Sequence, residues 1–428
     1  MALGHARGRG VIVEPDRLKG IGRLAERFVA NADFAGIAWR VGRHGRTLDE
    51  GCAGRADHAR LRPLTMDAVH RLYSMTKPVV SVAALRSIEA GELRLDDPVA
   101  RWLPGFARSR VLDAGGRLAD AVRPITVEDL LTHRAGLSYD FMPDCPVATL
   151  YREERLAADG ARPLATLVER LGELPLARQP GTAFYYSYAT DVLAHVLERV
   201  TGRTLREVLK GAVLDPLGMG ETDFGVAPTA RSRLVEMHGL RELGEVPPEI
   251  ESAQTLRPMD VEESYPSDAP DAFARGGIGL FSTVADYTRF AAFLIDGRSA
   301  SGEVLLSVPM LDMLWRNRLP RSQRPISTGR RPTPGYGWGL VGRVMTDIGE
   351  AMHLTVDGEG GWSGAASTWF WADRANGVSG VVLAQFLGST IPLGPLMQAA
   401  AYQGFVAEPA VGETSTGSRV ASGPDSGD

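Results

Sequence analysis

Apolar residues recur with a helical period in several stretches of the chain. From Glu14 to Ala30 they alternate with charged residues, which predicts a surface helix with one buried face. A longer apolar run with the same period follows Leu72 and reaches Ala90, where Gly91 is suited to cap the end of a helix. The same pattern predicts further helices at residues 126–133, 164–171, 187–200, 204–215, 283–295, 308–314 and 393–405.

Short stretches rich in valine and aromatic residues lie towards both ends of the chain. Residues 36–41 and 47–53 predict two strands near the amino terminus. Residues 336–345, 365–372 and 378–386 predict strands near the other end. This order predicts an α/β (α+β) fold, in which one antiparallel sheet is built from both chain ends and flanked by helices, with a helical insertion between them.

The predicted sheet divides the chain into a discontinuous domain and an insertion. We expect a sheet-containing domain from residues 11–88 and 276–408, and a mainly helical insertion domain from residues 89–275. Residues 225–271 are rich in proline and acid and lack a clear period, which indicates a long excursion over the surface or over a site. Residues 409–428 predict a disordered tail of serine, glycine and threonine. An active site is expected in the groove where the two domains meet.

Composition narrows the class of protein. The 428 residues are 44% apolar and 23% charged, which is typical of a soluble globular protein. A net charge of −5 gives no sign of a nucleic-acid partner. No run of eighteen apolar residues predicts a membrane span, and residues 1–10 lack the apolar segment of a secretory signal. Cys52 and Cys145 are interpreted as reduced thiols, so we expect a cytoplasmic protein.

A serine and a lysine stand at the head of the long apolar run. Ser74 and Lys77 are three residues apart, so in a first helical turn both side chains lie on one face. A neutral lysine amine can take the serine proton, and the amino terminus of a helix favours the anion that results. Pro78 fits this placement because proline is tolerated in a first turn. On its own, however, Ser-x-x-Lys most often marks a solvated face.

Two further motifs follow the Ser74-x-x-Lys77 pair in chain order. Residues 180–188 read Pro-Gly-Thr-Ala-Phe-Tyr-Tyr-Ser-Tyr, and residues 360–365 read Gly-Gly-Trp-Ser-Gly-Ala. Together the three resemble the serine β-lactamase and penicillin-binding-protein superfamily, over roughly residues 15–405. The resemblance is strongest to class C β-lactamases and family VIII carboxylesterases. Supporting stretches lie at residues 130–137, 216–219 and 276–282.

The second and third motifs depart from the β-lactamase pattern. That branch has Tyr-x-Asn as its second motif, whereas this chain has Tyr186 and then Tyr188. Its third motif is Lys-Thr-Gly, whereas this chain has Trp362, Ser363 and Gly364. Family VIII esterases commonly show a tryptophan in this place. An indole lacks the cation that pairs with the carboxylate of a lactam, so the departures favour an uncharged ester.

The resemblance implies a mechanism for ester hydrolysis. Ser74 is the expected nucleophile, and Lys77 with Tyr186 is the expected general base for acyl-enzyme formation and breakdown. Lys77 needs burial or neighbouring charge to lower its pKa for this role. The backbone N–H groups of Ser74 and Ala365 are expected to form the oxyanion hole. This mechanism requires no metal or organic cofactor, and the eight histidines show no metal-ligand spacing.

Other residues near the motifs have weaker signals. Tyr139 and Tyr188 are candidates for substrate binding with Trp362, Ser363 and Gly364, although loop aromatics are usually packed in the core. His133 is more often a hydrogen-bonded structural residue than a base. Gly364 is expected to let the backbone approach the substrate closely.

Several alternative functions share these residues. The acyl group could pass to an alcohol or amine in place of water, because both reactions use the same acyl-enzyme. A weak β-lactamase or a D-amino-acid amidase is a further alternative, disfavoured by the missing third-motif cation. A catalytically silent binding or scaffold protein is the alternative outside enzymology. The expected partner is a small-molecule ester, and the oligomeric state stays open.

Overall fold

A computed structural model describes residues 11–57, 61–113, 115–157, 160–239, 256–329 and 332–408. The predicted tail at residues 409–428 and the middle of the predicted excursion, residues 240–255, lie outside the described residues.

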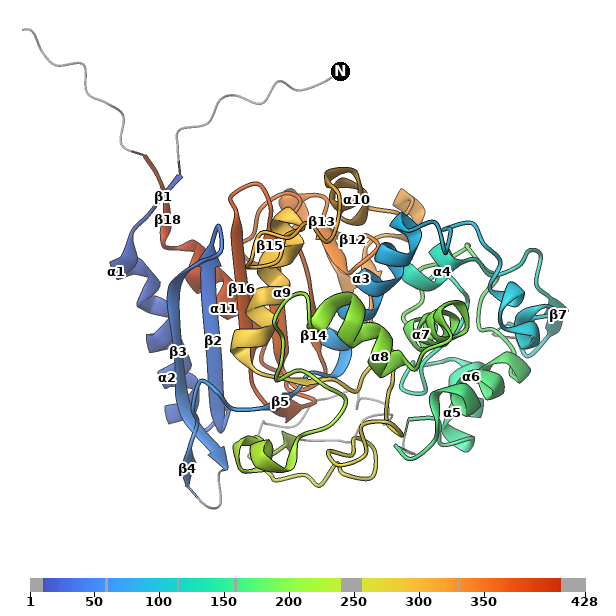
Figure 1. The fold of residues 1–428 in the computed structure, drawn as a ribbon, viewed down its shortest axis with the longest axis horizontal. Helices are drawn as coiled ribbons and strands as arrows, with labels where there is room; N and C mark the ends of the chain where they lie inside the picture. The colour runs from blue at the N-terminus through green and yellow to red at the C-terminus, as the bar shows by residue number, and fades with distance from the viewer. Residues whose placement is uncertain are drawn as a thin grey trace, which may run out of the picture.

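One eight-stranded antiparallel sheet forms the centre of the fold (Figure 1). Its strand order places three strands from the start of the chain beside five from its end, which confirms the predicted sheet. The strands, in their order across the sheet, are β12 (Tyr336–Trp338), β13 (Arg343–Met345), β14 (Gly360–Gly364), β15 (Thr368–Asp373), β16 (Val378–Leu383), β2 (Gly36–Arg43), β3 (Arg46–Asp57) and β4 (Arg62–Pro63).

The two faces of the sheet are both apolar and are covered by different helices. In β2, Ile37 and Trp39 belong to the apolar cluster that also contains residues of α2 (Gly20–Ala30) and α11 (Leu393–Tyr402). The intervening Ala38 belongs to the second cluster, which contains residues of α9 (Val284–Asp296). Because successive side chains of a strand point to opposite faces, this alternation places α2 and α11 on one face and α9 on the other.

Most of the remaining helices lie between the two groups of strands in the sequence and form the helical part to the right of Figure 1. The apolar cluster that contains α9 continues from the sheet into this part without a break. The other helices are α1 (Pro15–Leu18), α3 (Thr76–Glu89), α4 (Val127–Leu131), α5 (Pro146–Glu153), α6 (Leu164–Glu173), α7 (Ala189–Thr201), α8 (Leu205–Leu209) and α10 (Val308–Leu314).

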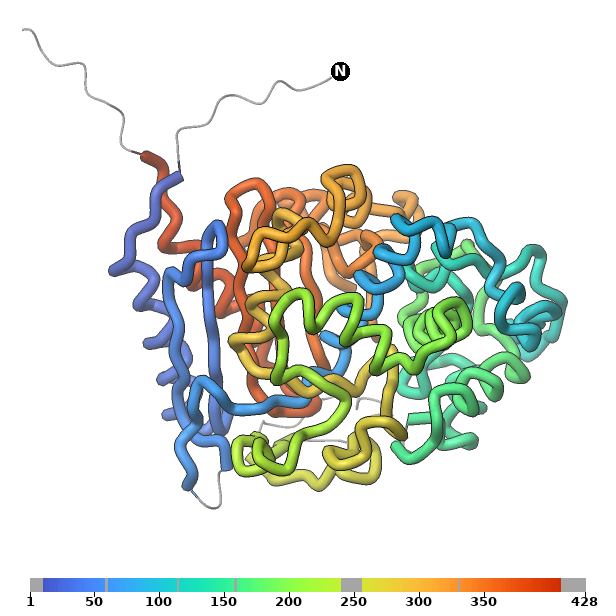
Figure 2. The backbone as a smooth tube through the Cα atoms, viewed as in Figure 1, coloured from blue at the N-terminus to red at the C-terminus, as the bar shows by residue number. Residues whose placement is uncertain are grey.

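Short strand pairs lie outside the main sheet, and three of them join distant parts of the chain. β1 and β18 bring the two ends of the described chain side by side, as the tube in Figure 2 shows. The pairs are β1 (Val11–Val13) with β18 (Phe405–Ala407), β5 (His70–Arg71) with β9 (Phe281–Ser282), β8 (His238–Gly239) with β17 (Phe386–Leu387), β6 (Arg110–Leu112) with β7 (Leu118–Asp120), and β10 (Ile326–Ser327) with β11 (Pro332–Thr333).

The prediction of the elements is wrong in detail at three places. The single strand predicted at residues 336–345 is two strands, because the chain turns back where Gly339 N–H donates to the Gly342 carbonyl at 2.9 Å. The chain also forms α5, which begins at Pro146, where no helix is predicted from the sequence. The last predicted helix ends at Tyr402, and residues 405–407 form a strand instead.

Candidate active site

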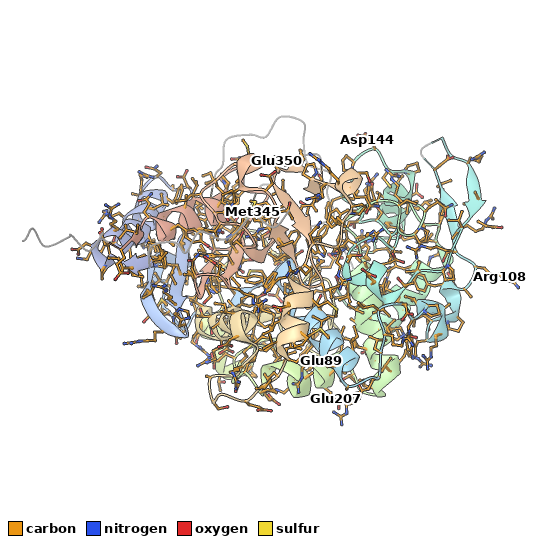
Figure 3. All side chains as sticks on the ribbon, turned by 90° about the horizontal axis from the view of Figure 1, so that it is seen from above. Glu89, Arg108, Asp144, Glu207, Met345 and Glu350 are labelled. Atoms are coloured by element: carbon orange, nitrogen blue, oxygen red, sulfur yellow. The ribbon has the colours of Figure 1, made fainter. Side chains whose placement is uncertain are left out.

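Ser74 lies in a tight turn at the buried start of α3. Residues 73–75 form one 3₁₀ turn, and the α-helix begins at Thr76, so Ser74 precedes the first helical turn. The far end of α3, Glu89, is exposed at the surface (Figure 3), so the helix runs inward to the serine. Tyr73 has a φ of +49°, which is strained for a bulky residue. This strained turn leaves Ser74 half-buried while both its neighbours are buried.

Lys77 is buried and aimed at Ser74. Its side chain is 2% exposed, and Nζ lies 3.1 Å from Ser74 Oγ. Nζ also donates to the Gly277 carbonyl at 2.6 Å and lies 4.8 Å from the centre of the Tyr186 ring. Burial lowers the pKa of Lys77 to about 7, against an opposing effect of the Asp191 carboxylate. The amine can therefore be neutral near neutral pH.

Tyr186 lies in the loop before α7, and its hydroxyl receives a hydrogen bond from the third motif. Trp362 Nε1–H donates to Tyr186 Oη at 3.2 Å. Burial raises the pKa of Tyr186, although hydrogen bonding to Ser74 and Trp362 opposes the rise. The phenol therefore keeps its proton near neutral pH.

The third motif lies on β14 and the turn that follows it. Trp362 is 5% exposed and packs edge-on against Trp338, with 4.4 Å between the rings. Ser363 and Gly364 are half-buried, and Ala365 is exposed in the turn to β15. A Cβ on Gly364 would lie 2.1 Å from the Leu72 carbonyl oxygen, so glycine lets this strand pack against the Ser74 turn.

Tyr139 and Tyr188 join the same aromatic cluster. Their rings are 4.4 Å apart, and Tyr139 is 5.3 Å from the ring of Tyr186. Lys77 Nζ lies 5.2 Å from the Tyr139 ring. Tyr188 Oη donates a long hydrogen bond of 3.5 Å to Asp140, and the buried Tyr139 hydroxyl has no hydrogen-bond partner among the described residues. Tyr139 thus contacts Lys77 directly. Tyr188 packs against Tyr139 and is part of the cluster through that ring.

His133 packs beneath the site as an uncharged ring. It lies 4.7 Å from Tyr186 and 5.1 Å from Trp338, centre to centre. Burial, together with the charge of Lys77, holds the pKa of His133 well below its usual value. Its φ of +52° is a second strained backbone position beside the site.

Two residues that the motifs did not single out complete the arrangement. Asp191, in the first turn of α7, accepts a hydrogen bond of 2.9 Å from the Gly277 N–H, and the Gly277 carbonyl holds Lys77. Gly277 falls within the supporting stretch at residues 276–282. Asp191 had one usable signal in the sequence: it is an acidic residue next to Val192 and Leu193, in the mainly apolar first half of a predicted helix.

No helix in the described parts of the chain is long and apolar enough to span a membrane. In the same parts, no group of three or more histidine, cysteine or acidic side chains is placed to hold a metal ion. Cys52 and Cys145 are free thiols.

Comparison with known proteins identifies the family. The model of the β-lactamase family matches residues 21–395. The chain belongs to the β-lactamase family. It is 32% identical to esterase EstB of Burkholderia gladioli over 378 residues, which cover 85% of this chain and 89% of EstB.

Solved structures of other proteins share this fold. EstCE1, described as a hydrolase with promiscuous acyltransferase activity, superposes with a TM-score of 0.76 at 26% identity, over 91% of this chain and 99% of EstCE1. A family VIII carboxylesterase superposes with a TM-score of 0.67 over 92% of this chain and 99% of its own, and at 19% identity that likeness concerns the fold alone. The protein is a serine hydrolase of the β-lactamase fold, in a group that includes esterases and acyl-transferring enzymes.

Proposed function

We propose that the protein is a carboxylesterase that hydrolyses short- to medium-chain esters through an acyl-enzyme on Ser74. The observation that carries the proposal is the buried Lys77 amine, 3.1 Å from Ser74 Oγ with a pKa near 7. A neutral amine at this distance accepts the hydroxyl proton as Ser74 attacks the ester carbonyl. The similarity to EstB supports an ester as the substrate.

Lys77 is the better base of the two candidate groups. The phenol of Tyr186 is protonated near neutral pH, so it cannot abstract a proton at the start of the reaction. Its place between Trp362 and Ser74 suits it to pass a proton to the leaving alkoxide and to orient water in the second step. The Trp362 N–H stabilises negative charge that develops on the phenol oxygen.

The oxyanion hole is assigned to the backbone N–H groups of Ser74 and Ala365. Ser74 lies in the turn before α3, and Ala365 lies directly after the strand that packs against this turn at Gly364. Donors held by a tight turn and by the end of a strand inside the sheet need no rearrangement as charge forms on the carbonyl oxygen.

The side chains at and around the third motif favour an uncharged substrate. Trp362 stands where the β-lactamases carry a lysine, and its single N–H is directed at Tyr186. Tyr139, Tyr186 and Trp362 form an apolar surface beside Ser74, which suits the acyl chain of an ester better than a carboxylate.

Transfer of the acyl group to an alcohol is the second candidate function. It uses the same Ser74 intermediate, and the similarity to EstCE1, described as a hydrolase with promiscuous acyltransferase activity, favours it over an amidase or a silent binding protein. Adding a primary alcohol to the ester assay would yield a new ester if transfer competes with hydrolysis.

The test is hydrolysis of p-nitrophenyl butyrate by the wild type and by Ser74→Ala. Loss of the nucleophile should lower turnover by about 10⁶. Rapid acid quenching of the wild type should leave a butyryl group on the peptide that contains Ser74, as measured by mass spectrometry. Retention of more than about a tenth of the activity in Ser74→Ala, with no acylated peptide, would exclude Ser74 as nucleophile.

A further inference from the structure

Asp191 is a buried carboxylate that the reaction outlined above leaves without a role. Its side chain is 2% exposed, in the first turn of α7, among apolar neighbours that include Val192 and Leu193. Burying an ionised carboxylate is costly unless hydrogen bonds or a nearby cation compensate it. Its surroundings should therefore reveal what this charge does.

The carboxylate is linked to the nucleophile through a single glycine. Asp191 Oδ1 accepts from Gly277 N–H at 2.9 Å, and the carbonyl of the same Gly277 accepts from Lys77 Nζ at 2.6 Å. Lys77 Nζ in turn lies 3.1 Å from Ser74 Oγ. A Cβ on Gly277 would lie 2.4 Å from Asp191 Oδ2 and 2.7 Å from the Tyr139 hydroxyl, so only glycine fits between these groups.

We propose that Asp191 is a positioning residue for the Lys77 base. It fixes Gly277, whose carbonyl directs the amine at Ser74, and its negative charge stabilises the ammonium that Lys77 becomes. This inference rests on the proposed roles of Ser74 and Lys77.

The proton transfer balances without any other partner. The Ser74 O–H bond breaks as its proton moves to the Nζ lone pair of Lys77, and the electron pair left on Oγ forms the bond to the ester carbon. Lys77 thereby gains one positive charge in a buried site. The Asp191 carboxylate, which is separated from Lys77 by Gly277, lowers the free energy of that buried charge. Ser74, Lys77 and Asp191 thus act as nucleophile, base and orienting group.

The other polar groups that face Lys77 cannot supply this charge. Tyr139 and Tyr186 are neutral phenols whose pKa values burial raises, and His133 is neutral because burial lowers its pKa. Burial raises the pKa of Asp191, whereas the charges of Lys77 and Arg275 and the hydrogen bond from Gly277 favour its ionised form. Asp191 is the negative charge that raises the pKa of Lys77, against the lowering by burial.

The chain offers a direct measurement, because it contains three lysines, Lys19, Lys77 and Lys210. Protein labelled with [ε-¹³C]lysine should give three resolvable signals, which Lys19→Arg and Lys210→Arg assign. Lys19, whose ammonium pairs with the exposed Asp16 on α1 (Figure 1), serves as internal reference. Titration of the Lys77 signal reports its pKa without any substrate.

Asp191→Asn keeps an acceptor for the Gly277 N–H but removes the charge. The pKa of Lys77 should fall by about one unit, because a nearby opposite charge shifts a pKa by that order. The matched control is Asp286→Asn, a buried aspartate in the first turn of α9 that also accepts a remote backbone N–H, from Glu221 at 2.8 Å. Asp286→Asn should leave the Lys77 titration unchanged. Asp191→Ser removes the charge with a smaller side chain. It gives a second measurement of the Lys77 pKa if the Asn variant fails to fold.

Kinetics supply the second readout. Because the base must be neutral, kcat/KM should rise with pH through the pKa of Lys77, and Asp191→Asn should move this rise to lower pH. Asp191→Ala, which also frees Gly277, should lower kcat about tenfold or more with little change in KM, and Asn should restore part of that loss.

An unchanged Lys77 titration in folded Asp191→Asn and Asp191→Ser would overturn the proposal and reduce Asp191 to a structural role. So would an equal shift in Asp286→Asn. If the wild type lacks esterase activity while the Lys77 titration shifts as expected, the proposed function fails and the coupling of Asp191 to Lys77 stands.

Discussion

The molecule buries a cation and a carboxylate in two places and arranges them differently. Arg343 in β13 contacts Glu359 directly, with Nη2 donating to Oε1 at 2.9 Å, and both side chains are at most 2% exposed. Lys77 and Asp191 are buried to the same degree, but Gly277 lies between them. Among the described residues, Lys77 is in no ion pair, and its contacts are a hydroxyl, a carbonyl and two aromatic rings.

This difference separates a structural pair from a reactive one. Glu359 also accepts hydrogen bonds from Tyr336 at 2.7 Å and Thr355 at 3.2 Å, and the Arg343 guanidinium lies 3.8 Å from the Trp369 ring. A guanidinium keeps its proton in proteins, so this pair has one charge state. Lys77 has no carboxylate in contact, and burial can lower its pKa to about 7. Because Gly277 separates the Asp191 carboxylate from the Lys77 amine, the amine can lose its proton and act as a base.

Replacing Lys77 with arginine should give the active site the fixed charge of the Arg343 region. We expect Lys77→Arg to lower kcat for p-nitrophenyl butyrate by about 10²–10⁴, the usual contribution of a general base. Lys77→Ala should lose at least as much, since it also removes the hydrogen bond to Ser74. An arginine variant with near-normal turnover would show that Lys77 provides only positive charge. Circular dichroism and thermal unfolding are the folding controls.

The converse change concerns the structural pair. Glu359→Gln leaves Arg343 buried without its counter-charge, which should lower the free energy of unfolding by about 3–5 kcal/mol. Urea unfolding measures this loss. The folded fraction should keep the wild-type pH dependence of kcat/KM. A shift of that pH dependence without loss of stability would contradict the separation of the two regions.

Local patterns predicted the fold and the first motif well. The Ser74 and Lys77 spacing is set within one turn of the chain, so their contact depends on backbone geometry that a short sequence specifies. The helix predicted from residue 126 likewise begins there, with the Thr126 side chain accepting from the Asp129 N–H. The sheet from both chain ends followed from the order of apolar strands.

The partners of these residues could not be predicted from local patterns. Trp362 meets Tyr186 across 176 positions of sequence, and Lys77 meets Gly277 across 200. Such contacts depend on how the sheet and the helical part pack, which no single stretch encodes. The same holds for Asp191, whose helix was predicted correctly but whose charge is compensated by residues on other elements. Strand breaks such as Gly339–Gly342 depend on close backbone approach, since a Cβ on Gly339 would lie 2.3 Å from the Leu314 carbonyl oxygen.

The smallest expected effect concerns Trp362, which gives the third motif an uncharged side chain. The uncharged indole predicts that the wild type turns over a cephalosporin weakly, or not at all, beside a simple ester. Trp362→Lys should shift the ratio modestly towards the cephalosporin, whose carboxylate can pair with the new ammonium. Added salt should weaken this gain by screening the charge. The shift should stay small because Tyr188 also departs from the β-lactamase pattern.

Trp362→Phe is the matched control for this last change, because it removes the N–H donated to Tyr186 without adding a charge. It should lower ester turnover and leave the cephalosporin-to-ester ratio near that of the wild type. If Lys and Phe lower both activities by equal factors, Trp362 acts only by holding Tyr186 and Trp338 in place. A wild type that hydrolyses a cephalosporin as fast as an ester would contradict the preference for uncharged substrates directly. A salt-sensitive gain in the lysine variant alone would locate that preference in the missing charge.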